Sequence, residues 1–211
     1  DLSRIRTVLS TGAPLERNQF HWVYEAVKDA IQLASISGGT DIIGCFMGGN
    51  PYMPVYAGEI QGPALGVDMA AFDEHGHPVV NAQGELVCRQ PHPSMPVGFW
   101  QDPGGQKYRK TYFADYPGVW RHGDFVTFTA HGGVTVSGRS DATLNPGGVR
   151  IGTAEIYRAV EALPEIVDSI VVGHRAAGDE QIVLFVVLPP GQTLTPQLEE
   201  RIRNTIRVRN T

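Results

Sequence analysis

The sequence lacks the features of a membrane or secreted protein. It contains no run of about 18 apolar residues, the length that a membrane-spanning helix needs. It shows no signal peptide, and it has only two cysteines, Cys45 and Cys88, whose spacing fits neither a metal site nor a redox motif. Isolated thiols are typical of a reducing compartment, so we expect a cytoplasmic protein without a membrane span.

An excess of positive charge is also missing. The formal net charge is −5 at pH 7, which predicts no general attraction to nucleic acid or to anionic membranes. Hydrophobic residues make up 42% of the chain and charged residues 18%, a balance typical of a folded globular protein. We therefore expect small-molecule partners and no nucleic acid.

The two ends of the sequence resemble cut ends. The chain opens at Asp1 without a methionine, almost inside a strand-like run at residues 5–9, and closes at Thr211 within a helical pattern. We therefore expect an internal piece of a longer enzyme. The alternative is a complete small protein whose flexible ends were trimmed.

The first 41 residues predict a strand–helix–strand unit. Residues 5–10 and 31–36 are apolar, strand-like runs, and residues 15–28 carry apolar side chains at helical spacing after Pro14. This order predicts a parallel crossover, and open α/β sheets bind ligands at the carboxyl edge of their strands. Residues 37–41 follow the second strand at that edge, where a plain glycine turn is the alternative.

Residues 44–101 differ in character, because glycines and prolines separate short apolar runs at 64–67, 69–72 and 85–88. This pattern predicts a small β-barrel or a distorted sheet. Residues 75–78, His-Gly-His-Pro, predict a hairpin turn. A metal role for its two histidines is conceivable, but a solvated turn is the favoured interpretation.

A second hairpin is predicted from two strands at residues 125–129 and 134–137. Asp124 precedes the first of them and is expected at the mouth of the hairpin. A carboxylate there could accept hydrogen bonds from both hydroxyls of a ribose. The alternative is an aspartate that only forms a turn.

The last 70 residues predict an α+β unit. A helix is expected from Gly152 or Thr153 to residue 163, strands at 166–172 and 182–188, and a final helix from Thr195. The natural boundary before this unit lies at residues 139–141.

The loop that leads into this unit has the most informative composition. Between Arg139 and Arg150 stand the paired glycines Gly147 and Gly148, and the run continues directly into a helix. Arginine suits phosphate and ribose oxygens, and glycine lets the backbone approach a ligand closely. The composition of this loop predicts that it binds a polyanionic ligand and that it changes conformation. A charged turn between two elements is the alternative.

Several motifs, taken in their order along the chain, resemble those of a known protein family. They are Thr11-Gly12-Ala13-Pro14, Gly39-Thr40-Asp41, Gly84-Glu85-Leu86, Arg121-His122-Gly123-Asp124, Gly138-Arg139-Ser140-Asp141 and residues 148–156. In this order and spacing they resemble the adenylate-forming superfamily of acyl-CoA synthetases, peptide-synthetase adenylation domains and luciferases. The form of residues 144–156 is similar to the acetyl-CoA synthetase branch, and residues 37–42 are similar to its acetoacetate-activating members.

This resemblance implies a fold of class α/β plus α+β. Residues 1–138 would form the C-terminal part of the large ATP- and acyl-binding domain, with a parallel sheet edge and a small distorted β-barrel. Residues 139–141 would be a hinge, and residues 142–211 an incomplete small mobile domain.

The resemblance also implies where the nucleotide binds. It assigns Gly12, Ala13 and Pro14 to the adenine pocket. It places Gly39 and Thr40 beside the α-phosphate, where Thr40 would assist catalysis.

Charged residues complete this implied nucleotide site. Asp124 would bind the ribose hydroxyls, with Arg139 supporting the same ribose. Arg150 would approach the phosphate and act as the principal catalytic donor. Asp41 stands where the family usually has a glutamate associated with Mg²⁺, and its side chain is shorter than that glutamate.

Other family roles fall on the mobile part. Asp141 would be the hinge residue, and Gly147 and Gly148 would lie along the pantetheine arm of coenzyme A. The family's phosphate loop with its lysine, and its late catalytic lysine, have no counterpart in the sequence, since Lys28, Lys107 and Lys110 stand in other contexts. We therefore expect the chain alone to be inactive.

Gly38 predicts the size of the acid. In acetyl-CoA synthetases a tryptophan stands two positions before the motif threonine and closes the pocket over acetate, and here that position is Gly38. Removal of an indole would open space for a longer acid. The resemblance thus implies an ATP-dependent acid–thiol ligase that uses ATP, Mg²⁺ and coenzyme A, with acetoacetate as its acid. Propionate, butyrate, 3-hydroxybutyrate and acetate remain alternatives, as does a non-catalytic nucleotide-binding module.

Overall fold

The structure is a computed structural model that describes residues 1–144, 151–176 and 179–209. The chain divides into two compact units, Asp1–Val136 and Ser137–Thr211, and each is described by itself.

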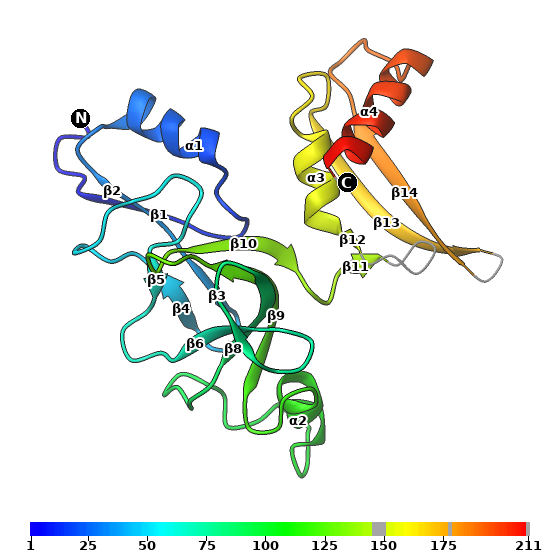
Figure 1. Ribbon diagram of the computed structural model, residues 1–211. Coiled ribbons are helices and arrows are strands. Elements are labelled where there is room, and N and C mark those ends of the chain that lie inside the picture. Colours follow the sequence, from blue (N-terminus) through cyan, green and yellow to red (C-terminus); the bar gives the residue numbers. More distant parts are fainter. Residues whose placement is uncertain (145–150, 177–178, 210–211) are drawn as a thin grey trace. The chain divides into compact units, whose positions relative to one another are not determined.

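The first unit begins with a parallel strand pair and its crossover. β1 (Thr7–Ser10) pairs in parallel with β2 (Gln32–Ser35), and Ser10 lies opposite Ser35. Between them run α1 (Arg17–Trp22) and a π-helical turn, η1 (Val23–Val27), drawn in blue in Figure 1. The parallel crossover predicted for this segment is confirmed.

The helix of this crossover begins later than predicted. Glu16 is the N-cap, and its backbone N–H donates to the side chain of Gln19 at 2.8 Å. This reciprocal capping box satisfies the free amides of the first turn, so the helix begins at Arg17. The expected start at residue 15, directly after Pro14, was wrong by two residues.

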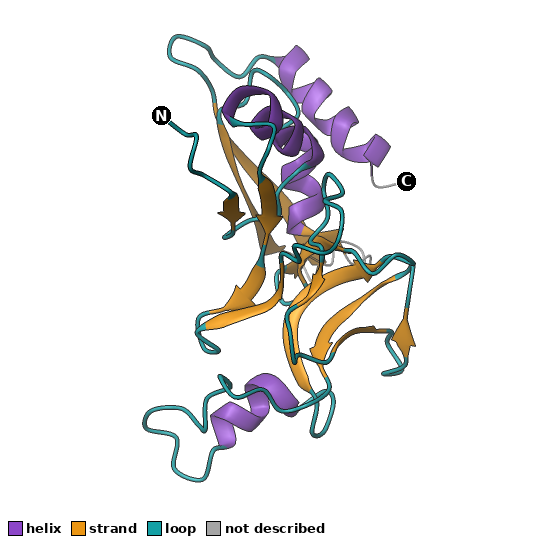
Figure 2. Ribbon diagram, turned by 90° about the vertical axis from the view of Figure 1, so that its left-hand side faces the viewer, coloured by secondary structure: helices purple, strands orange, loops and turns teal. Residues whose placement is uncertain are grey.

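Two antiparallel sheets follow. The order in the smaller sheet is β3-β4-β5 and in the larger β10-β9-β8-β6-β7. Figure 2 draws all strands in orange and all helices in purple. Their bounds are β3 Ser37–Gly39, β4 Gly44–Gly48, β5 Gly62–Pro63, β6 Met69–Phe72, β7 Pro78–Val79, β8 Gln83–Cys88, β9 Trp120–Phe128 and β10 Val134–Arg139.

One hydrophobic core lies between these two sheets. It contains Phe46 and Met47 of β4, Leu86 of β8 and Trp120 of β9, all 1% exposed or less. An antiparallel bridge between Ile60 and Val134 also links the two regions. These strands agree with the distorted sheet that the sequence predicts, whereas a closed barrel stays a prediction.

β9 contains a bulge in its first half. Opposite β8, Phe125 pairs with Glu85 and Arg121 pairs with Val87, so β9 has extra residues between these two pairs. Gly123 lies in this stretch with φ +86°, a conformation that costs other residues energy. Asp124 therefore lies within β9, and the predicted start of this strand at residue 125 was wrong, because β9 begins at Trp120.

A short helix without a sequence prediction covers one end of this core. α2 (Gln106–Phe113) begins after Gly105, and the Asp102 carboxylate accepts hydrogen bonds from the amides of Lys107 and Tyr108. These backbone hydrogen bonds lower the pKa of Asp102. The Tyr112 ring of this helix stacks on Trp120 with ring centroids 3.5 Å apart.

The second unit is an α+β arrangement. Its antiparallel hairpin packs one face against two helices, and Ile156, Val160, Val171 and Ile202 belong to the shared core. The bounds are β11 Thr143–Leu144, β12 Ile151–Gly152, α3 Thr153–Val160, β13 Asp168–Ala176, β14 Asp179–Val187 and α4 Pro196–Arg209. The predicted order of helices and strands is confirmed. Within the described ranges, no helix combines the length and the apolar character needed to cross a membrane.

The two cysteines of the first unit provide a simple test of its packing. Cys88 is 1% exposed, burial raises the pKa of its thiol, and its Sγ donates to the carbonyl of Gln90. Cys45 is only half-buried. Because the thiolate is the reactive form, we expect iodoacetamide at pH 8 to label Cys45 well before Cys88 in the native chain.

Mass spectrometry of proteolytic peptides measures this difference. In the control variant Cys45→Ser, we expect label only after denaturation. Labelling of Cys88 in the native state at the rate of Cys45 would contradict the packing of β8.

Candidate functional site

The carboxyl ends of β1 and β2 bring two predicted segments to one edge. The amide of Ile36 donates to the carbonyl of Ser10 at 2.9 Å, so the chain after β1 and the chain after β2 leave the pair side by side. Gly12, with φ +94°, Ala13 and Pro14 follow β1 and are exposed. This is the edge at which open α/β sheets bind ligands.

A strained turn presents the other segment. Thr40 and Asp41 are exposed, and the Thr40 carbonyl accepts a hydrogen bond from the amide of Ile43 at 3.1 Å. Ile43 has φ +48° and is 91% exposed. A β-branched residue in this conformation costs about 1–3 kcal/mol, and such strain is concentrated at ligand sites. The turn keeps both polar side chains at the surface.

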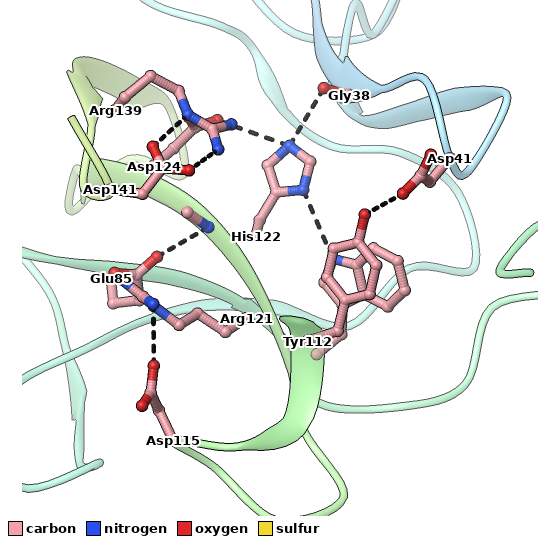
Figure 3. A network of polar contacts seen from close by, with 12 residues as sticks. Gly38, Asp41, Glu85, Tyr112, Asp115, Arg121, His122, Asp124, Arg139 and Asp141 are labelled. Carbon is pink, nitrogen blue, oxygen red and sulfur yellow. Dashed lines mark hydrogen bonds and ion pairs between the residues drawn. The ribbon is translucent and has the colours of Figure 1, made fainter. Parts of the chain in front are cut away.

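Asp41 is held by an aromatic neighbour. The hydroxyl of Tyr112 donates to Oδ2 of Asp41 (Figure 3), and the Tyr112 ring stacks on the buried Trp120. Over the residues that the structure describes, no group of three or more acidic, histidine or cysteine side chains is placed to hold a metal. Asp41 is thus a single carboxylate in a fixed position.

A buried histidine connects Gly38 with Asp124. Nε2 of His122 lies 3.1 Å from the carbonyl oxygen of Gly38 and 3.6 Å from Oδ2 of Asp124 (Figure 3). On the other side of the ring, Nε1 of Trp120 donates to Nδ1 of His122 at 3.5 Å. His122 and Asp124 are both less than 10% exposed. The structure therefore brings the predicted acyl-side and ribose-side residues into one network.

A second network holds the bulge that carries Asp124. The Glu85 carboxylate accepts a hydrogen bond from the amide of Gly123 at 2.9 Å and pairs with Arg121 at 3.1 Å. Arg121 also pairs with Asp115 at 2.9 Å. Burial lowers the pKa of Arg121, but these two carboxylates outweigh burial and raise it overall. Glu85 thus fixes the backbone next to Asp124.

Gly38 and Gly39 are both in close contact with neighbours. A Cβ atom on Gly38 would lie 2.0 Å from the carbonyl oxygen of Gly44 and 2.8 Å from Cα of Cys45. A Cβ atom on Gly39 would lie 3.0 Å from the imidazole of His122. Gly38 therefore has a packing role against β4, whatever the size of the acid. Its place in an acyl pocket stays a prediction.

The remaining predicted residues all belong to the second unit, and some of them lie outside the described ranges. Nε of Arg139 donates to Oδ1 of Asp141 at 2.8 Å, and both side chains are about half exposed. Gly147, Gly148 and Arg150 lie outside the described residues, so their predicted roles stay predictions.

Sequence reasoning gave no role to several residues of these networks, among them Tyr112, Arg121 and His122. Tyr112 lies in a helix that the sequence did not predict. Arg121 and His122 were part of a motif but received no role. The signal for His122 was its place between an aromatic residue and an aspartate at the alternate positions of a strand, Trp120 and Asp124.

The chain is similar to known proteins over nearly its whole length. It is 54% identical over 207 residues to an acetoacetyl-coenzyme A synthetase of Rhizobium meliloti. This match covers 98% of the present chain but only 32% of that relative. The structure of an acetoacetyl-CoA synthetase from Streptomyces lividans matches with a TM-score of 0.85 at 48% identity, covering 98% of this chain and 32% of that one. No family model matches the chain.

A more distant structure shares the fold alone. It is an anthranilate CoA ligase in complex with anthranoyl-AMP, with a TM-score of 0.75 at 21% identity, covering 99% of this chain and 39% of that one. The chain spans about a third of the length of the curated relatives it matches. The resemblance predicted from the motifs is thus confirmed: nearly all of this chain is similar to one part of the acetoacetyl-CoA synthetases, and its fold is that of CoA ligases.

Proposed function

We propose that this chain provides the ribose-, phosphate- and acid-binding part of an ATP-dependent acetoacetate–CoA ligase. The observation that carries the proposal is the network through His122, which joins Gly38 to Asp124. The exposed residues Thr40 and Asp41 directly follow the strand that contains Gly38. In this proposal the acid, the phosphate and the sugar would bind at neighbouring places.

The nucleotide would bind along the carboxyl edge of β1 and β2. Gly12, Ala13 and Pro14 would line the adenine, since they are exposed beside the end of β2. The Asp124 carboxylate would accept hydrogen bonds from the ribose hydroxyls, with Arg139 supporting the same ribose. The anthranilate CoA ligase of similar fold binds an acyl-AMP, which supports a nucleotide at this fold.

In the first half-reaction, a carboxylate oxygen of acetoacetate attacks the α-phosphorus of ATP. The new P–O bond forms while the bond to pyrophosphate breaks, and the products are acetoacetyl-AMP and pyrophosphate. Two anions meet in this step, so fixed donors must stabilise the transition state. The Thr40 hydroxyl and the Arg150 guanidinium would supply them.

The residues present fit a Mg²⁺ ion that arrives with ATP. Asp41 would provide one carboxylate oxygen, and phosphates and water would provide the other ligands, as is usual for Mg²⁺ with nucleotides. When bound, the ion would neutralise phosphate charge. Tyr112 would keep the Asp41 carboxylate in place through its hydrogen bond.

In the second half-reaction, the thiol of coenzyme A attacks the acyl carbon of acetoacetyl-AMP. A C–S bond forms, the thiol loses its proton, and AMP leaves with the electrons of the broken C–O bond. Gly147 and Gly148 would lie along the pantetheine arm. For one site to serve both steps, the small domain at residues 142–211 would rotate about residues 139–141, with Asp141 as the hinge residue.

Acid-dependent exchange of pyrophosphate into ATP tests this proposal in the full-length protein. We expect acetoacetate to give the strongest exchange in a comparison with acetate, propionate, butyrate and 3-hydroxybutyrate. Strongest exchange with acetate would overturn the assignment of the acid. No exchange with any acid would favour a non-catalytic nucleotide-binding module.

The substitution Arg150→Ala is expected to slow adenylation by about 100-fold or more, the usual cost of losing one transition-state donor. ATP affinity should fall much less, because the charge matters most when the phosphorus is pentacoordinate. Single-turnover kinetics and ATP binding in the full-length protein measure the two effects. Arg203→Ala, which removes an exposed arginine paired with Glu199, is the matched control. Equal losses in rate and affinity would reduce Arg150 to a binding residue.

A further inference from the structure

We propose that His122 is a positioning residue whose neutral imidazole holds the Gly38 carbonyl and the Asp124 carboxylate at a fixed separation. The inference rests on the proposed function, because these groups would face the acid and the ribose. His122 itself contacts no substrate in this proposal. Its effect on the reaction passes through Gly38 and Asp124.

The hydrogen bonds around the ring determine its protonation. The indole N–H of Trp120 can only donate, and it points at Nδ1 of His122 at 3.5 Å. Nδ1 must therefore accept, which leaves the proton on Nε2. From there the N–H donates to the carbonyl of Gly38 at 3.1 Å, with the Asp124 carboxylate 3.6 Å away. The network specifies one neutral tautomer.

Packing prevents the ring from turning away. Phe46 contacts it edge-to-face with ring centroids 5.1 Å apart, and only 6% of the His122 side chain is exposed. A Cβ atom on Gly39 would lie 3.0 Å from Cε1, so the backbone of β3 lies directly against the imidazole. A glycine is needed there for this close approach. The ring is thus a rigid spacer between β3 and the bulge of β9.

Two substitutions separate hydrogen bonding from packing. In His122→Phe an aromatic ring remains against Phe46, but the donor to Gly38 and the acceptor for Trp120 are lost. In His122→Gln one side chain still offers both a donor and an acceptor. The matched control is His92→Phe, because His92 also packs edge-on against Phe46, at 6.3 Å, and binds only within its own segment, to Ser94 at 2.8 Å.

Nuclear magnetic resonance of this chain tests the tautomer without any activity. We expect long-range ¹H–¹⁵N correlations of His122 at pH 7 to show a protonated Nε2 and an unprotonated Nδ1. We also expect His122→Phe to shift the amide signals of Gly39 and Asp124, while His122→Gln restores them and His92→Phe leaves them unchanged. A protonated Nδ1, or unshifted signals in His122→Phe, would overturn the proposal.

Kinetics of the full-length protein test the consequence. Loss of a buried hydrogen-bond partner costs enough free energy to change an equilibrium or rate constant by about tenfold or more. We therefore expect His122→Phe to lower kcat/KM by at least about tenfold, both for ATP and for the acid. The kcat/KM of His122→Gln should lie within about threefold of the parent value. The kcat/KM of His92→Phe should equal the parent value. Equal impairment of the Phe and Gln variants would overturn the positioning role. If the parent protein shows no exchange with any acid, the proposed function fails, and the resonance measurements alone decide the role of His122.

Discussion

Replacing Asp124 by alanine is expected to weaken ATP binding by about 10- to 100-fold, the usual value of charge-assisted hydrogen bonds. The carboxylate is only 8% exposed and directly follows the bulge residue Gly123. Because both ribose hydroxyls would lose their acceptor, binding of AMP should fall by a similar factor. Calorimetric titration of the full-length protein with each nucleotide measures the effect.

A surface carboxylate of the same unit provides the control for this variant. Asp68 directly precedes β6 and pairs with Arg89, which directly follows β8, and we expect Asp68→Ala to leave nucleotide affinity unchanged. Unchanged ATP affinity in Asp124→Ala would remove Asp124 from the ribose site. The thermal unfolding of both variants shows whether a loss of affinity is due to binding alone.

Replacing Gly38 by alanine is expected to destabilise the first unit by about 3 kcal/mol, because the backbone must move to accept the new atom. The added Cβ would lie 2.0 Å from the carbonyl oxygen of Gly44, and backbone cannot rotate away as a side chain can. Urea denaturation followed by fluorescence of the buried Trp120 measures the change.

Gly98→Ala is the matched control for this substitution. A Cβ atom at Gly98 would meet nothing within 4 Å, so we expect a change of no more than about 0.5 kcal/mol. A Gly38→Ala variant as stable as the parent would contradict the close approach of β3 and β4. For the same reason, Gly38→Trp should unfold this region and should not simply switch the preferred acid to acetate.

Several strands could be predicted because they are short apolar runs in the sequence. The run at Met69–Phe72 was predicted with the bounds that β6 has, and the parallel pair β1 and β2 differed only at its ends. In these segments local pattern and tertiary packing favour the same structure.

Gly123 explains why β9 was predicted poorly. Gly123 and its polar neighbours interrupt the strand pattern, so the strand was predicted to begin only at residue 125. The chain instead continues the strand and uses the positive φ of Gly123 to form a bulge. Only the pairing with β8, which is distant in the sequence, distinguishes the two outcomes.

Only those residues of the candidate site that belong to recognisable sequence motifs could be predicted. The sequence indicated Thr40, Asp41 and Asp124. It also showed His122 two residues before Asp124, but not the contact of His122 with Gly38 in the other sheet. Such contacts depend on tertiary packing, which brings β3 and β9 together. The packing role of Gly38 also became visible only with the backbone of β4 in place.

A crystal structure of the full-length protein with AMP tests the central claim most directly. The account predicts the ribose hydroxyls within hydrogen-bonding distance of the Asp124 carboxylate, the phosphate beside Thr40, and the adenine against Gly12, Ala13 and Pro14. Nucleotide bound at another edge of the protein, with Asp124 still hydrogen-bonded only to protein groups, would contradict it.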